Sequence, residues 1–207
     1  LIRFGMGTQR VEEELKSKFP EARLARADSD TMTHARDYER LVSDFQQRNT
    51  DVLLGTQMIA KGLDFPFVSF VGVVNADTSM SVPDFRAAER TFQMVTQVAG
   101  RAARAEAGGK VIVQSLLGPS PALMFAANHD YTSFADHELA IRQRLGWPPF
   151  SRLARVIVSH RSAAQSREQA KQLVDTIRQF ITTQGLAADV LGPQSAPLAR
   201  LRNAYRH

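Results

Sequence analysis

Short apolar runs that alternate with helical patterns constrain the fold of this chain more than any other feature. Three such runs are Val52–Leu54, Val68–Val74 and Val111–Val113, and Arg23–Ala27 is a shorter strand candidate. Runs this brief and this apolar are typical of strands that are covered on both faces of a sheet. They predict a buried sheet in the first half of the chain.

Between these runs, apolar residues recur at the spacing of amphipathic helices. The first predicted helix begins at Gly7-Thr8 as its cap and stops at Pro20, a second is centred on Leu41, and a third begins near Pro83. Strands that alternate with helices predict an α/β fold with a parallel sheet over residues 1–117.

The rest of the chain has a different pattern. Pro119 and Pro121 open a predicted helical connector that runs to about Leu145, within residues 118–150, and Pro148-Pro149 breaks it. A strand, a helix and a strand are then expected at residues 153–158, 163–183 and 189–191. Together with a strand-like segment that starts after Pro197 and runs to the end of the sequence, they predict a small α+β domain over residues 151–207.

Positive charge is concentrated in this last part. Residues 142–207 hold 11 Lys or Arg against 3 Asp or Glu, whereas residues 1–141 hold 15 against 18. A basic segment of this kind is typical of a nucleic-acid contact, and an arginine-rich solvated surface is the alternative.

Composition excludes several other classes of protein. The chain has no cysteine, which rules out disulfides and thiolate metal sites within it. It has no apolar run of about 18 residues, so no membrane span is expected.

Leu1 stands where an initiator methionine would, which suggests an internal part of a longer protein. Neither Asp28 with Asp30 nor the scattered histidines complete a ligand set, so we predict no metal site in this chain.

Two motifs carry most of the functional information. One is Gly55-Thr56-Gln57-Met58-Ile59-Ala60-Lys61-Gly62-Leu63-Asp64-Phe65-Pro66, and the other is Gln97-Val98-Ala99-Gly100-Arg101-Ala102-Ala103-Arg104. Together they resemble motifs V and VI of superfamily 2 helicases. The strings Asn75-Ala76-Asp77, Pro83–Phe92 and Gly146–Ala154 are similar to the PriA family of replication-restart helicases, also called primosomal protein N′. This second resemblance covers nearly the whole chain.

The resemblance implies a RecA-like second helicase lobe that faces a first lobe across ATP. In that family the motif VI arginines reach the phosphates, so Arg104 is the first candidate for an arginine finger and Arg101 the second. Gln97 would orient water or couple the site to DNA. Ordinary surface arginines on a helix are the alternative.

Other residues are assigned to nucleotide or to DNA. The resemblance makes Asp64 a contact of the nucleotide ribose or of a finger arginine, with a simple turn carboxylate as the alternative. Gly62 permits a close approach of backbone to nucleotide. Gly55, Thr56 and Lys61 are expected to contact DNA phosphates. A fourth DNA contact is predicted at Thr8, where exposed N–H groups of a helix N-terminus attract phosphate.

An ATP-driven enzyme also needs a glycine-rich phosphate loop with Lys and Ser/Thr, and this sequence contains none. We therefore expect ATP with Mg²⁺ to be bound jointly with a missing first lobe, and the chain alone to be inactive. In the resembled family, zinc-binding cysteine clusters lie upstream, so zinc is expected in the parent protein and not in this chain.

The resemblance implies part of an ATP-dependent 3′-to-5′ DNA helicase that acts in replication restart and primosome assembly at stalled forks. Its expected partners are forked or single-stranded DNA, single-strand-binding protein and other primosome proteins, in the bacterial cytoplasm at the nucleoid. Two alternatives stay open: another superfamily 2 translocase, and a non-catalytic DNA-binding or scaffolding module.

Overall fold

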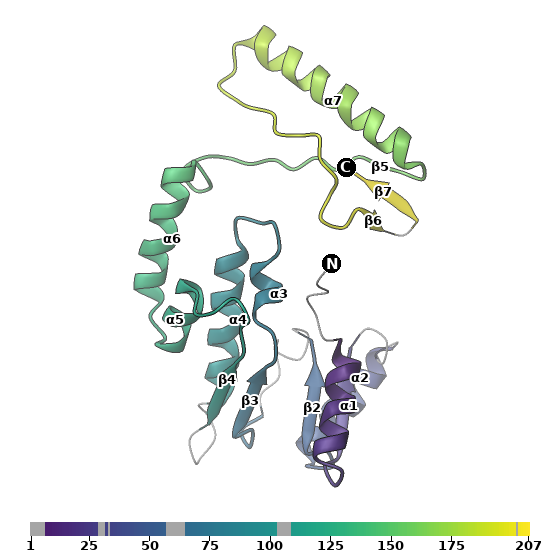
Figure 1. Ribbon diagram of the computed structural model, residues 1–207, viewed down its shortest axis with the longest axis vertical. Helices are drawn as coiled ribbons and strands as arrows, with labels where there is room; N and C mark the ends of the chain where they lie inside the picture. The colour runs from purple at the N-terminus through teal and green to yellow at the C-terminus, as the bar shows by residue number, and fades with distance from the viewer. Residues whose placement is uncertain (1–6, 29–31, 33, 57–64, 103–108, 202) are drawn as a thin grey trace. The chain divides into compact units, whose positions relative to one another are not determined.

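The computed structural model describes residues 7–28, 32, 34–56, 65–102, 109–201 and 203–207. The chain divides into two compact units, unit 1 (Leu1–Ile141) and unit 2 (Arg142–His207). Figure 1 shows the elements of each.

Four strands of unit 1 form two parallel pairs. The first pair joins β1 (Leu24–Ala27) to β2 (Val52–Gly55), and the second joins β3 (Phe70–Val73) to β4 (Lys110–Val113). All four strands were predicted, and their parallel direction confirms an α/β arrangement. Among the described residues, the two pairs are hydrogen-bonded separately, so the predicted parallel sheet is present here as two halves.

The helices of unit 1 follow the predicted alternation with these strands. They are α1 (Thr8–Lys18), α2 (Ala35–Gln46), α3 (Asp77–Met80), α4 (Ala87–Ala102), α5 (Pro121–Ala127) and α6 (Tyr131–Leu145).

Helix α1 begins one residue earlier than it would with Thr8 as its cap. Gly7 is the N-cap residue and contributes no side chain, whereas Thr8 is the first helical residue. No side chain caps the helix, and its first turn contains no acidic residue. The Thr8 hydroxyl instead donates to Asp28 Oδ2 at 2.6 Å, outside the helix.

Helix α4 begins four residues after Pro83. The reason is a turn at Asp84, whose side chain accepts a hydrogen bond from the Arg86 amide at 3.0 Å and whose carbonyl accepts one from Ala87. Asp84 Oδ2 also pairs with the guanidinium of Arg90 at 3.0 Å. An aspartate that bonds the backbone two residues on favours a turn over a helix, so Pro83 lies outside α4.

The predicted continuous connector helix is interrupted. Helix α5 ends at Ala127 and α6 starts at Tyr131, because His129 has φ of +53° and Asp130 begins a new helix. The Asp130 carboxylate accepts from the Ser133 side chain and amide, and these bonds lower its pKa. This is the bonding of a helix N-cap, which the sequence signals by an aspartate before Tyr131.

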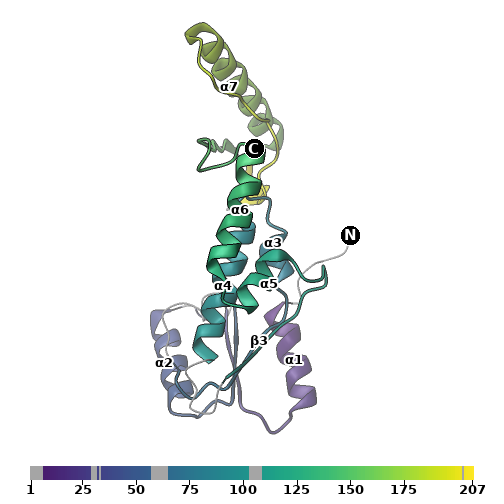
Figure 2. The same cartoon turned by 90° about the vertical axis from the view of Figure 1, so that its left-hand side faces the viewer.

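The core of unit 1 lies where α4, α5 and α6 meet. Phe92 stacks on Phe134 with ring centroids 4.3 Å apart, and Val95, Ala122 and Ala126 complete the buried cluster. Figure 2 shows α4 and α6 running alongside each other with α5. The predicted connector therefore belongs to the core of unit 1, although it was expected to form a separate segment.

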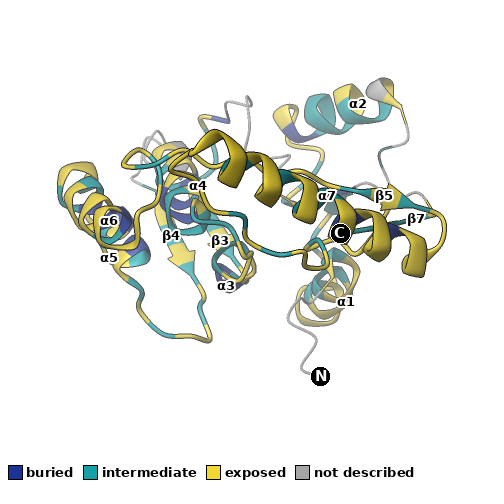
Figure 3. Cartoon of the chain, turned by 90° about the horizontal axis from the view of Figure 1, so that it is seen from above, coloured by how far each residue is buried: buried dark blue, intermediate teal, exposed yellow. Residues whose placement is uncertain are grey.

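Unit 2 contains one long helix, α7 (Ala163–Gln184), close to its predicted bounds. It ends at Gly185, whose φ of +61° suits glycine. The hydroxyl of buried Ser166 donates to the carbonyls of Val158 and Tyr205 and so ties the helix to the neighbouring strands. Figure 3 shows that most of α7 is otherwise exposed.

The described part of unit 2 has three strands, and the sequence predicted only the strand-like segment that follows Pro197. They are β5 (Ser159–His160), β6 (Arg200–Leu201) and β7 (Ala204–Arg206), in the antiparallel order β5-β7-β6. The predicted strand at 153–158 reaches this sheet only at Val158, which exchanges two backbone hydrogen bonds with His207. Residues 189–191 are not a strand. Apolar runs alone could not reveal which segments have a pairing partner.

A buried carboxylate joins the ends of β3 and β4. Asp77 accepts hydrogen bonds from the Ser115 hydroxyl and from the Leu116 amide, both at 2.6 Å. The Ser115 hydrogen bond is the main cause that lowers the pKa of Asp77, and the backbone amides of Leu116 and Leu117 add to it. The charged form therefore holds the connection after β4 against the start of α3.

We predict that Phe92→Ala destabilises the chain by about 3–5 kcal/mol, because it removes a ring that is 4% exposed and stacked on another ring. Urea unfolding followed by circular dichroism measures this change. Phe70→Ala is the matched control, since Phe70 is 57% exposed, and we expect its cost to be much smaller. Equal costs would contradict the assignment of the core.

We also predict that Asp77→Asn lowers the stability of the fold at neutral pH. The variant should also lose less stability than the unmodified chain when the pH is lowered. Folding lowers the pKa of Asp77, so its charged form stabilises the folded state. This stabilisation is complete at a pH above the ordinary pKa of a carboxyl group, and it disappears as the pH falls below about 4. Thermal unfolding from neutral pH down to about pH 3 measures both effects. The control is Asp136→Asn, at an exposed position of α6, which should leave the profile unchanged. An unaltered profile in Asp77→Asn would refute the role of this carboxylate.

Candidate functional site

The carboxyl ends of β1 and β2 lie at one edge of the first strand pair. Ala27 is in register with Gly55, so Asp28 and Thr56 leave the two strands at the same level. Parallel α/β folds bind ligands at this edge, beyond the carboxyl ends of their strands. Gly55 and Thr56 are both exposed there.

A polar network brings the start of α1 to the same edge. Thr8 donates its hydroxyl to Asp28, and the guanidinium of Arg26 lies 3.3 Å from both Asp28 and Glu12. The side chains of Arg26 and Asp28 are largely buried. The carboxylates are thus balanced by a neighbouring cation, and the N-terminus of α1 is held beside the end of β1.

This network changes what Thr8 offers to a phosphate. Its hydroxyl proton is already used by Asp28, so a phosphate at this position would meet backbone N–H groups of the first turn, which have no partner within a helix. We considered Asp28 only as a metal ligand, with Asp30, and did not predict its bond to Thr8. The position of an acidic residue directly after a predicted strand was the feature of the sequence that could have indicated this bond.

The three remaining motif V candidates, Lys61, Gly62 and Asp64, lie outside the described residues. The described chain reaches Thr56 on one side of them and resumes at buried Phe65 on the other.

Helix α4 carries the motif VI candidates that the structure describes. Gln97 is exposed, and Arg101 follows it by four residues in the last turn, a spacing that places both on one helix face. The backbone therefore confirms that Gln97 and Arg101 share a helix. Arg104, the first candidate for a finger, lies outside the described residues.

Glycine at position 100 has no packing explanation among the described residues. A Cβ there would meet no heavy atom within 4 Å, and Gly100 is exposed. Glycine inside a helix costs up to about 1 kcal/mol relative to alanine. The side of α4 next to Arg101 thus has open space where another molecule can approach the backbone.

The second strand pair has its own polar edge. The Asn75 side chain accepts hydrogen bonds from the amides of Asp77 and Thr78 at the start of α3. With the Asp77–Ser115 bond, these contacts fix the turns after β3 and β4. Asp77 belongs to the Asn75-Ala76-Asp77 string, and the structure identifies Ser115 as its side-chain partner.

Unit 2 presents an exposed basic surface. Its exposed cations include Arg152, Arg155, Arg161, Arg167 and Lys171. The guanidinium of Arg200 lies 5.3 Å from the ring centroid of Tyr205, so a cation already covers a face of this ring.

Two features are absent from the described residues. No group of three or more His, Asp or Glu side chains is placed to hold a metal ion there. No described helix is long and apolar enough to cross a membrane.

Comparisons with known proteins agree with this division of the chain. Residues 1–106 match the model of the helicase conserved C-terminal domain, and residues 143–207 match that of the primosomal protein N C-terminal domain.

Curated relatives match over almost the whole chain. It is 45% identical to the replication restart protein PriA of Bacillus subtilis, over 99% of this chain and 25% of that protein. The corresponding protein of Treponema pallidum is 42% identical, over 98% of this chain and 30% of its own length. That of Haemophilus influenzae is 36% identical, over 100% of this chain and 28% of its own length.

The chain thus spans between a quarter and a third of the length of these relatives. The first family model covers half of the chain, in unit 1, and the second lies within unit 2. The chain therefore belongs to the family of helicase conserved C-terminal domains, and the proteins that it resembles along its full length are PriA replication restart proteins.

Proposed function

We propose that this chain is the second motor lobe, with the start of the C-terminal domain, of an ATP-dependent helicase that acts in replication restart. The observation that carries the proposal is the order of the two matches. A helicase C-terminal domain occupies unit 1, and a primosomal C-terminal domain follows in unit 2 of the same chain.

In this proposal α4 supplies the cation that completes a nucleotide site. Arg104 is the arginine finger, Arg101 assists it from the last turn of α4, and Gln97 on the same face orients water or transmits the state of the site to DNA. A guanidinium placed across a cleft stabilises the charge of a phosphoryl group in transfer. The exposed Gln97 and the open space beside Gly100 support this placement.

The polar edge of the first strand pair would hold the DNA backbone. The hydroxyl of exposed Thr56, the amides near Gly55 and the first-turn amides at Thr8 are donors for phosphate, and Lys61 adds a charge. Contacts of this type position a strand without reading its sequence. The exposed cations of unit 2 extend the interaction, so binding should be strongly dependent on salt.

ATP and its Mg²⁺ would be shared with a first lobe that carries the phosphate-binding loop, because this sequence has no such loop. The ion, when bound, offsets the charge of the phosphates. Gly62 and Asp64 would contact the nucleotide from this side. Zinc would be held by other parts of the parent protein.

The finer parts of the proposal go beyond the names of the relatives, which state only a role in replication restart. From the motif resemblance we further propose that the parent protein unwinds DNA in the 3′-to-5′ direction and binds forked or single-stranded DNA. We also propose single-strand-binding protein and other primosome proteins as its partners, and a cytoplasmic location. A non-catalytic DNA-binding module is the second candidate, favoured by the basic charge of unit 2.

We predict that Arg104→Ala in the full-length protein lowers DNA-stimulated ATP hydrolysis by about a thousandfold, while binding to forked DNA is retained. Steady-state hydrolysis and fluorescence anisotropy measure the two properties. Arg86→Ala is the matched control, since exposed Arg86 pairs with Glu89 before the other end of α4. Unchanged turnover in Arg104→Ala would exclude the finger role.

We also predict that the isolated 207-residue chain hydrolyses no ATP and binds forked DNA weakly, with an affinity that falls as salt is raised. Both properties are measured on the purified chain across a salt series. Measurable hydrolysis would contradict the proposal that half of the nucleotide site lies elsewhere.

A further inference from the structure

The segment that follows α6 leaves the helix in a fixed direction. Helix α6 ends at Leu145, and Gly146 has φ of +62°, a conformation that suits glycine at the end of a helix. The Gly146 amide donates to the carbonyl of Gln143 at 3.2 Å. The Trp147 amide donates to the carbonyl of Arg142 at 2.8 Å. Both bonds use carbonyls of the last helical turn, so they tie the start of this segment to α6.

A second turn brings two aromatic residues to neighbouring positions. The Phe150 amide donates to the Trp147 carbonyl at 3.0 Å, so these residues are the first and last of a four-residue turn. The Cα atoms at the two ends of such a turn lie within about 7 Å of each other. Trp147 is 37% exposed and Phe150 is 49% exposed. Residues Gly146–Phe150, here called the aromatic turn, therefore present two partly exposed rings side by side in the chain.

The aromatic turn lies in a stretch of the chain without negative charge. No Asp or Glu occurs between Glu138 and Glu168, whereas this stretch contains six arginines. Two of them, Arg144 and Arg152, are exposed and stand two residues before and two residues after the aromatic turn. Exposed rings beside cations match the chemistry of a single-stranded nucleic acid, whose bases stack on aromatic side chains and whose phosphates attract cations.

We propose that the aromatic turn is a stacking site for an unpaired DNA base, with Arg144 and Arg152 as contacts of the neighbouring phosphates. The proposal rests on the proposed function and deepens it, because it adds a base contact in unit 2 to the phosphate contacts proposed for unit 1. Every base has an aromatic face, so stacking holds a strand without reading its sequence.

A protein surface is the other occupant that such rings fit. Leu145 and Leu153 are also exposed, at 50% and 56%, and aliphatic side chains favour a protein contact. The six arginines without an intervening carboxylate favour a polyanion instead. A measurement that detects the base itself distinguishes the two occupants.

The fluorescence of the chain supplies this measurement. Trp147 is the only tryptophan of the 207 residues, so the tryptophan emission reports on the aromatic turn alone. The probes are a single-stranded oligothymidylate, an oligonucleotide of the same length without bases, and a blunt duplex. We expect the oligothymidylate to quench the emission, because a stacked base contacts the indole ring. The other two should leave it unchanged, since one has no bases and the other keeps its bases inside the helix.

Variants of the same chain test the second ring. Phe150→Leu removes the ring and should weaken the binding of oligothymidylate by about fivefold or more, measured by fluorescence anisotropy of a labelled probe. Phe150→Tyr keeps the ring and should bind within about twofold of the unmodified chain. Phe180→Leu is the matched control, because Phe180 is 58% exposed on α7, and its affinity should also stay within about twofold.

Binding of oligothymidylate with unchanged tryptophan emission would overturn the inference. Equal affinities of Phe150→Leu and Phe150→Tyr would overturn it as well. In both cases DNA still binds through its phosphates, so the DNA contact in the proposed function stands and only the aromatic turn is refuted. If the chain binds none of the three probes at low salt, the inference and that DNA contact fail together. The finger role of Arg104 is decided separately, by hydrolysis in the full-length protein.

Discussion

Parallel pairing of short strands is the constraint on which the rest of unit 1 depends. Parallel strands run in the same direction, so paired strands end at the same edge of the sheet. The chain must therefore cross back to the opposite edge before the next strand begins. The registers of Ala27 with Gly55 and of Val73 with Val113 express this rule. It places polar residues from distant parts of the sequence beside one another.

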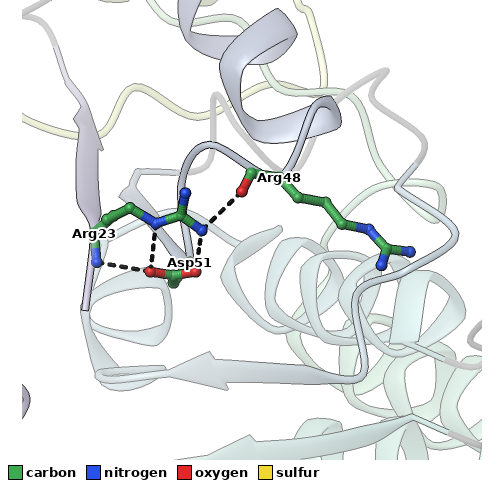
Figure 4. Close-up of polar contacts among 3 residues, drawn as sticks. All are labelled: Arg23, Arg48 and Asp51. Atoms are coloured by element: carbon green, nitrogen blue, oxygen red, sulfur yellow. Dashed lines mark hydrogen bonds and ion pairs between the residues drawn. The ribbon is translucent and has the colours of Figure 1, made fainter. Parts of the chain in front are cut away.

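The carboxyl and amino edges of the strand pairs carry different side-chain contacts. At the carboxyl edges lie the Thr8–Asp28 bond and the Asp77–Ser115 bond, which hold turns and leave donors exposed. At the amino edge of the first pair lies the Arg23–Asp51 pair, and Arg23 also binds the carbonyl of Arg48 (Figure 4). The guanidinium of Arg48 contacts the Phe67 ring. The exposed ion pair by itself adds little stability. Its place in the structure indicates that it orients the chain around Arg48.

The sequence predicted the strands of unit 1 because their apolar runs are bounded by clear breaks, and it predicted α7 because its apolar residues keep a helical period. It could not predict the interruption at His129, since that depends on a left-handed residue and on the Asp130 cap. Nor could it place β5, whose pairing with β7 joins residues far apart in the chain. In the site, the helical pattern that starts near Pro83 does extend to Gln97 and Arg101, whereas Arg104 lies outside the described residues. The bond of Thr8 to Asp28 depends on tertiary contact, which spacing does not contain.

The central claim is that this chain places a cation on a nucleotide that another lobe holds. A structure of the full-length protein with ADP and a γ-phosphate analogue measures this most directly. The account predicts a guanidinium nitrogen of Arg104 or Arg101 within about 3 Å of an oxygen or fluorine of the analogue. Both guanidinium groups facing solvent, away from the analogue, would contradict it.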